Sequence, residues 1–384
     1  MTHKKLTLSL IVGAALVLMV TAYAEKPDKD NIGPYKFLKT IPIPTGLVGF
    51  DISWVDSAAS RYYLANRGDA TAKPPVAPTI DVINTEKLTL VEQIKLHTAG
   101  NGVVAIHKGG SDDEGEGNEK GTLVVGGADS TAIFIDLANT SNQFAVPTGG
   151  TMRADELAFD PVHKIILIAN DRTVDDFVTF ISTKGFPHGG EPPHVLGHIK
   201  YDGSVTGVPH ANGIEQPVWD GRTKKFYLAI PDTFPASKGE VDEIDPVEMA
   251  VTRRFTTTCG PAGLVLIPGQ RLMTSCGDVI DIKAGAVVHT VAKVGGDEIW
   301  FNHGDDRVYF GGGLDRISVP VVNALSPFDL ITTLTVGKLA APPEPAHTTH
   351  SVAADSENLR VFVPVTHEGI KVYTDATGDE DNDN

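Results

Sequence analysis

Acidic residues recur at one position of a repeated pattern, directly before short apolar runs that close on aspartate or asparagine. Five residues before the closing position stand Asp51, Asp155, Glu215, Asp297 and His350, and the following position adds Glu156 and Glu298. Carboxylates gathered at one point repel one another unless protons or a cation neutralise them. Oxygen ligands suit Ca²⁺, Mg²⁺ or Mn²⁺, and a histidine also admits Zn²⁺. We therefore predict a divalent metal held by Asp51, Glu156, Glu215, Glu298 and His350.

Such a metal would polarise a carbonyl group while a nearby residue acts as general base, which is the chemistry needed to open a lactone or ester. The predicted catalytic residues are His350, Glu298 and Glu215. Residues close to them in the sequence are the predicted substrate-binding groups: Arg153, His210, Asn212, Asp155 and Asp297. In the alternative interpretation the carboxylates are turn residues that bind backbone N–H groups, and the protein is a non-catalytic binding platform.

The elements that position these residues are seven similar units. Five units join an apolar strand, a polar turn and a second apolar strand: 50–66, 154–170, 214–230, 296–311 and 349–364. Weaker copies occupy 101–126 and 262–275. Units of about 49 residues are typical of β-propeller blades, whose inner strands border a central channel. We predict an all-β, seven-bladed propeller in which the orphan strand at 35–41 completes the last blade.

The ends of the second strands, Tyr63-Leu64-Ala65-Asn66 and Leu167-Ile168-Ala169-Asn170, resemble the repeats of exported YVTN (surface-layer-type) seven-bladed propellers. The resemblance extends over essentially the whole chain after its first two dozen residues. Distantly similar rings include lactonases and a streptogramin lyase, whereas other YVTN proteins are interaction modules. The resemblance therefore implies either a metal-dependent hydrolase or lyase, or a binding platform. The characteristic Asn and Asp ligand segments of the lactonases are absent, so no catalytic residue is transferred from them.

The start of the chain has the pattern of a signal peptide, with Lys4 and Lys5, an apolar run, and Ala22-Tyr23-Ala24 as the cleavage site. We predict a signal peptide at 1–24, a linker at 25–34, the propeller at 35–376 and an acidic disordered tail at 377–384. The protein would then be periplasmic or extracellular, with no membrane span after cleavage. In an oxidising compartment the two cysteines, Cys259 and Cys276, are expected to form a disulfide across the fifth blade.

The formal net charge of −17 disfavours nucleic acid, because binding to phosphate backbones requires clustered positive charge. The expected partner is a small-molecule ligand or another exported protein. No serine-hydrolase elbow, zinc-protease helix or phosphate-binding glycine loop occurs in the sequence.

Overall fold

The computed structural model describes residues 35–107, 121–171, 176–187 and 189–375. The predicted signal peptide, linker and acidic tail lie outside these residues. Among the described residues, no helix has the length and apolar character needed to cross a membrane.

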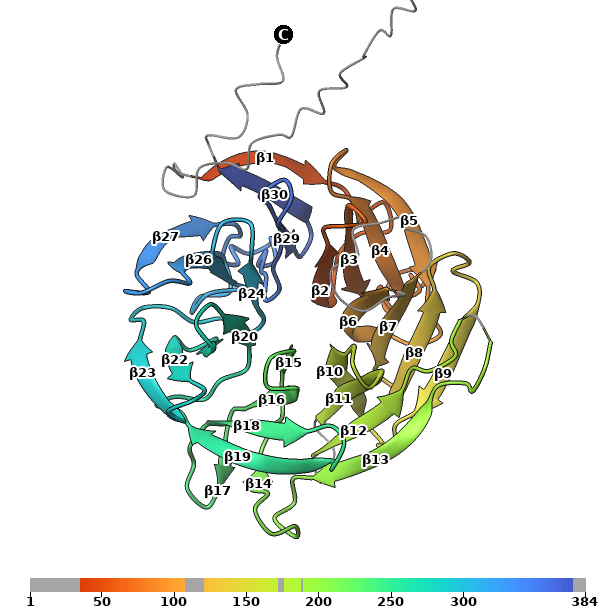
Figure 1. Ribbon diagram of the computed structural model, residues 1–384. Coiled ribbons are helices and arrows are strands. Elements are labelled where there is room, and N and C mark those ends of the chain that lie inside the picture. Colours follow the sequence, from red (N-terminus) through yellow and green to blue (C-terminus); the bar gives the residue numbers. More distant parts are fainter. Residues whose placement is uncertain (1–34, 108–120, 172–175, 188, 376–384) are drawn as a thin grey trace, which may run out of the picture.

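The described strands form seven four-stranded antiparallel sheets arranged around one axis, together with a two-stranded sheet (Figure 1). This confirms the predicted all-β, seven-bladed propeller. Blade 1 comprises β2 (Phe50–Asp56), β3 (Arg61–Asn66), β4 (Thr79–Asn84) and β5 (Thr89–Lys95). Blade 2 comprises β6 (Gly100–His107), β7 (Gly121–Gly127), β8 (Thr131–Asp136) and β9 (Gln143–Pro147). Blade 3 comprises β10 (Arg153–Asp160), β11 (Ile165–Asp171), β12 (Phe177–Ser182) and β13 (His194–Lys200).

Blade 4 comprises β15 (Pro217–Asp220), β16 (Lys225–Ile230), β18 (Glu240–Asp245) and β19 (Ala250–Thr256). Blade 5 comprises β20 (Leu264–Ile267), β21 (Arg271–Thr274), β22 (Asp278–Asp281) and β23 (Ala286–Thr290). Blade 6 comprises β24 (Ile299–Asn302), β25 (Arg307–Phe310), β26 (Ser318–Asn323) and β27 (Leu330–Thr335). The two-stranded sheet pairs β14 (His210–Ala211) with β17 (Thr233–Phe234).

Both faces of each blade are apolar, because alternate side chains of a strand point to opposite faces of the sheet. In β3, Tyr62 and Leu64 pack with residues of blade 7, whereas Tyr63 and Ala65 pack with residues of blade 2. A single four-stranded sheet would leave both of these faces in water. Stacking seven of them in a ring buries both faces of every blade and places the first strand of each blade at the axis.

The ring is closed by β1 (Tyr35–Ile41), as the sequence predicts. This strand pairs antiparallel with β30 (Gly369–Asp375), so the seventh sheet has the order β1, β30, β29 (Arg360–Val365), β28 (Ala353–Asp355). Tyr35 also contacts blade 6, because its hydroxyl lies 2.7 Å from the Tyr309 hydroxyl and accepts a hydrogen bond from Arg307 Nη1 at 2.5 Å. The closing strand is thus fixed to two blades.

The predicted disulfide between Cys259 and Cys276 is present, with the two Cα atoms 6.3 Å apart. Cys259 precedes β20 and Cys276 follows β21, so the bond joins the segments on either side of the first hairpin of blade 5. Because three of the four strands of this blade have only four residues, we infer that the crosslink compensates for a short hydrogen-bond ladder.

Blades 1 and 2 are also joined by a histidine, whose charge leads to a testable pH dependence. His107 Nε2 lies 2.5 Å from Asp56 Oδ2, and this hydrogen bond raises the pKa of His107 above its ordinary value of 6.5 although burial opposes the shift. A raised histidine pKa stabilises the fold fully below 6.5, and this stabilisation is lost as the pH rises through the raised value.

We expect His107→Gln to lower the free energy of unfolding by about 0.5 kcal/mol near pH 5.5, because the side chain is 42% exposed and solvent weakens the pair. Near pH 9 the variant and the wild type should have about equal stability. Urea denaturation at the two pH values measures both differences. The same difference at both values would show that the charge of His107 contributes nothing.

Candidate functional site

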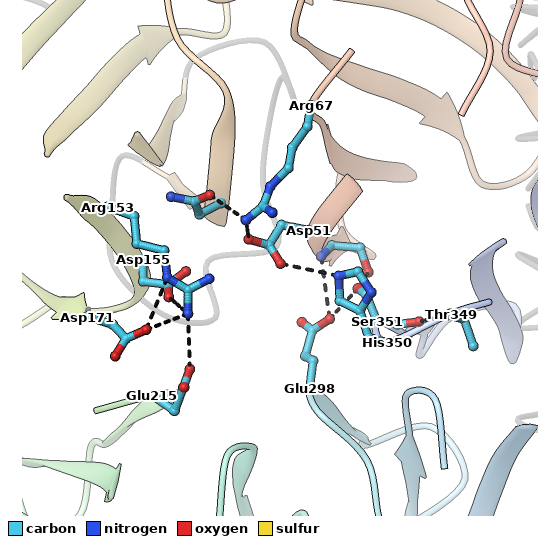
Figure 2. Close-up of polar contacts among 12 residues, drawn as sticks. Asp51, Arg67, Arg153, Asp155, Asp171, Glu215, Glu298, Thr349, His350 and Ser351 are labelled. Carbon is cyan, nitrogen blue, oxygen red and sulfur yellow. Dashed lines mark hydrogen bonds and ion pairs between the residues drawn. The ribbon is translucent and has the colours of Figure 1, made fainter. Parts of the chain in front are cut away.

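Charged side chains from the first strands of blades 1 and 3, from the ends of their second strands and from the segments before β15 and β28 lie close together (Figure 2). These side chains form two groups that face each other. The Arg153 group consists of Arg153, Asp155, Asp171 and Glu215. The Asp51 group consists of Asp51, Arg67, Asn101 and His350.

In the Arg153 group, one guanidinium group contacts three carboxylates. Arg153 is the first residue of β10 and pairs with Asp171, the last residue of β11. Its Nη2 atom lies 2.6 Å from Asp155 Oδ2, 2.7 Å from Asp171 Oδ2 and 3.9 Å from Glu215 Oε2. One oxygen from each carboxylate lies within 4.8 Å of the other two. Three acidic groups therefore share one positive charge in a small volume.

The carboxyl groups bind protons more tightly than usual because they are buried beside one another. Burial, the Asp51 carboxylate and Asp171 raise the pKa of Asp155 to about 8, although Arg153 opposes the shift. Burial followed by Asp155 and Asp171 raises the pKa of Glu215 well above its ordinary value. The single guanidinium thus leaves negative charge uncompensated, and part of the group holds protons at neutral pH.

Glu156 adds a fourth carboxyl group beside this cluster. A β-bulge between Ala154 and Leu157 disturbs the alternation of the strand, so Asp155 and Glu156 are both buried. Burial and the charges of Glu215 and Asp155 raise the pKa of Glu156 well above its ordinary value. Among the described residues, Glu156 Oε2 has no hydrogen-bond partner, and Asp155 Oδ2 has an ion-pair contact but accepts no hydrogen bond. Buried acceptors without partners are costly and indicate a site that can receive a cation or a donor.

The Asp51 group orients a histidine. Arg67 Nη2 donates to Asp51 Oδ2 and also to Asn101 Oδ1, which lies 2.7 Å away. His350 Nε2 lies 3.3 Å from Asp51 Oδ1, and the imidazole stacks on Phe50 with ring centroids 4.6 Å apart. Burial opposes ionisation of Asp51, but the hydrogen bond from His350 and the charge of Arg67 outweigh it and lower the Asp51 pKa. An ionised Asp51 holds the His350 ring in one orientation, as positioning of a general base requires.

Glu298 makes contacts that join blades. Its Oε2 atom accepts hydrogen bonds from the Ser351 hydroxyl and from the backbone N–H of Ser53, 3.5 Å away. Glu298 is 1% exposed, and burial raises its pKa well above the ordinary value. These bonds connect blade 6 with blades 7 and 1, so Glu298 stabilises the arrangement of the strands around the axis.

The remaining predicted residues are not members of the two groups, although, besides burial, the charge of Asp297 raises the pKa of Glu215 and of Glu156. Asp297 is half-buried, and its backbone N–H donates to Gly311 O at 3.0 Å. His210 belongs to the small β14–β17 sheet, where its ring contacts Phe234 with centroids 5.1 Å apart. Asn212 follows that strand, and its backbone N–H donates to Asp232 O at 3.0 Å.

Three residues of the site are not identified by the sequence analysis: Arg67, Asn101 and Asp171. Arg67 and Asp171 each follow the asparagine that ends a repeated strand motif, so the repeat alignment held a signal for them. Blade 1 places the acid on the first strand and the arginine after the second, and blade 3 reverses this order. In blade 2 the equivalent residue is Gly102, where a Cβ atom would lie 2.4 Å from Asp155 O. That contact explains why blade 2 contributes no side chain at this position.

Both groups include side chains that are partly exposed to solvent. Trp54 and Trp300 lie further along the first strands of blades 1 and 6, and their ring centroids are 5.1 Å apart. The two indole rings therefore link blades that are not neighbours in the ring, since blade 7 lies between blades 6 and 1. Side-chain exposure is 38% for Arg67 and 22% for His350 in one group, and 20% for Arg153 and 18% for Glu215 in the other. Each group therefore has two side chains that a ligand can reach from solvent.

Comparisons with known proteins show the fold. No family model matches the chain, and no curated protein matches it. Among solved structures, a chain in the "Crystal Structure of Mitotic Checkpoint Complex" is similar, with a TM-score of 0.59 and 13% sequence identity over 97% of this chain and 99% of that one. At this identity the likeness extends to the fold alone. The YVTN resemblance remains a prediction from the repeats, and the comparison supports the seven-bladed β-propeller fold.

Proposed function

We propose that this protein is an exported propeller that binds a divalent cation between Asp155, Asp171 and Glu215 and acts on a small molecule as a lactonase-like hydrolase or a lyase. The observation that carries the proposal is the convergence of three carboxylate oxygens within 4.8 Å, next to the buried and unpartnered Glu156 Oε2. Export rests on the signal peptide predicted at 1–24.

The donor atoms fit a hard cation. All three are carboxylate oxygens, which suit Ca²⁺, Mg²⁺ or Mn²⁺ better than Zn²⁺. Glu215 is the one ligand predicted from the sequence that belongs to the set of Asp155, Asp171 and Glu215. Glu156, also predicted as a ligand, lies beside this set. Asp51, His350 and Glu298 are engaged in the contacts described above. Arg153 provides the positive charge between the same three carboxylates, and it has to move before a cation can bind there.

The chemistry would be divided between the two groups. A bound cation supplies Lewis acidity toward a carbonyl oxygen. On the opposite side, Asp51 holds His350 so that the imidazole can accept a proton from an attacking water or from a carbon acid. Arg67 donates to both Asp51 and Asn101, which fixes the Asp51 carboxylate, and its side chain is 38% exposed to solvent. This arrangement supports ring opening of a small lactone.

A non-catalytic binding platform is the second candidate, and one observation favours it. Arg153 already pairs with Asp155 and Asp171 at 2.6 and 2.7 Å, so the carboxylates have a counter-ion within the chain. In that case the axial charges would stabilise the ring, and the loops would contact a protein partner.

Elemental mass spectrometry of the purified protein, combined with melting in the presence and absence of chelator, separates the two candidates. We expect one divalent ion per chain, and stabilisation of about 2.7 kcal/mol when the free ion is at a hundredfold excess over its dissociation constant. Glu215→Gln should abolish this stabilisation, whereas Glu248→Gln, at an exposed turn, should retain it. Lactone hydrolysis that is lost in His350→Asn would support the enzyme. Absence of both bound metal and a chelator effect would favour the platform.

A further inference from the structure

We propose that Arg153 is a tethered competitor of the axial cation, so that a divalent ion binds only when the guanidinium group leaves the three carboxylates. This inference rests on the cation site proposed above and concerns what sets the affinity of that site.

The geometry allows one positive charge at a time. Arg153 Nη2 is 2.6 Å from Asp155 Oδ2 and 2.7 Å from Asp171 Oδ2, and a calcium ion would lie 2.3–2.6 Å from the same kind of oxygen. The ion and Nη2 would therefore occupy nearly the same position. Two cations this close repel strongly where little water screens them. Binding of the ion and pairing of Arg153 are mutually exclusive.

The arginine can leave without rearrangement of the fold. Its backbone is at the first residue of β10, next to the loop that contains Met152, which is 48% exposed. The Arg153 side chain is itself 20% exposed, so rotation about its own bonds can carry the guanidinium group toward solvent. The carboxylates stay in place because β10, β11 and the segment before β15 hold them.

The competition predicts a measurable affinity difference. When only a fraction of the protein has the site open, the apparent dissociation constant is the intrinsic constant divided by that fraction. If Arg153 fills the site about nine-tenths of the time, its removal tightens cation binding about tenfold. A longer residence of Arg153 in the site gives a larger factor.

Isothermal titration calorimetry with Mn²⁺ measures this difference in affinity on the full-length protein. We expect Arg153→Gln to bind Mn²⁺ at least about tenfold more tightly than the wild type. Arg153→Lys, which keeps the charge, should bind more weakly than Arg153→Gln. Arg222→Gln is the matched control, because Arg222 is exposed at a turn of blade 4 and its replacement changes the net charge equally. This control should bind like the wild type.

The outcomes distinguish the two proposals. If the dissociation constants of the wild type and of Arg153→Gln for Mn²⁺ agree within about twofold, Arg153 does not compete with the ion, and the proposed cation site is retained. If neither binds up to about millimolar Mn²⁺, the cation site itself is wrong. If Arg153→Gln fails to fold, NMR of the arginine side chains of the wild type shows whether Arg153 leaves the carboxylates when the ion binds. Addition of Ca²⁺ should shift the Arg153 Nε–H resonance, and an unchanged resonance would overturn the inference.

Discussion

Replacing Arg153 with glutamine is expected to lower the free energy of unfolding by about 3 kcal/mol in metal-free protein. The substitution removes the one guanidinium group that pairs with Asp155 and Asp171 and leaves both carboxylates beside Glu215 and Glu156. Breaking a buried ion pair by removing one partner costs more than the pair contributes, because the remaining charge stays away from water. Urea denaturation with chelator present, followed by tryptophan fluorescence, measures the loss.

Arg222→Gln again serves as the control and should change the free energy of unfolding by less than about 0.5 kcal/mol. Addition of Mn²⁺ should return much of the lost stability to Arg153→Gln, since the ion replaces the missing positive charge. A loss below about 1 kcal/mol without metal would show that protons alone neutralise the carboxylates and that Arg153 contributes little.

The second large effect concerns closure of the ring. Ile41→Asn is expected to lower the free energy of unfolding by about 4 kcal/mol, because a 2%-exposed side chain of the closing strand is replaced by an amide that has to be buried. Ile41 packs with Phe50 of blade 1 and with Phe362 and Ile370 of blade 7. The substitution therefore weakens the one interface that depends on both ends of the described chain.

Lys39→Asn, two residues earlier on the same strand and exposed, is the matched control and should be nearly neutral. Guanidinium denaturation of both variants gives the comparison. If Ile41→Asn cost no more than Lys39→Asn, the pairing of β1 with β30 would contribute little to stability.

The fold could be predicted because it consists of repeated units that are visible in the sequence. Apolar alternation with polar turns gave seven units, and the position of Cys259 and Cys276 around one hairpin indicated their disulfide. The unpaired strand at 35–41 predicted closure, since the last unit lacked its outermost strand. Each of these arguments uses spacing within a unit or a count of units, and both are properties of the sequence itself.

The site could be predicted only in part, because its geometry depends on irregularities. Equivalent positions placed Asp51 near His350 and Asp155 near Glu215. The bulge in β10 buries Asp155 and Glu156 together, whereas regular alternation would turn one of them away. Arg67 and Asp171 each follow the asparagine that closes an apolar strand motif, so the repeat alignment could have identified both positions although the hydrophobic pattern could not. The hydrogen bonds that Glu298 accepts from Ser351 and Ser53 also depend on the packing of three blades, which the repeat pattern does not specify.

The pairing of Tyr35 with Asp375 in one sheet has a consequence for the order of folding. Contacts between residues so distant in the sequence form slowly, because a very long loop must close first. A chain synthesised from its N-terminus can stack blades 1 to 6 early, but β1 has no partner until β30 has emerged. A chain truncated before β30 would leave the edge of β29 uncovered and the ring open. We therefore expect such fragments to be more sensitive to proteases than chains that contain β30.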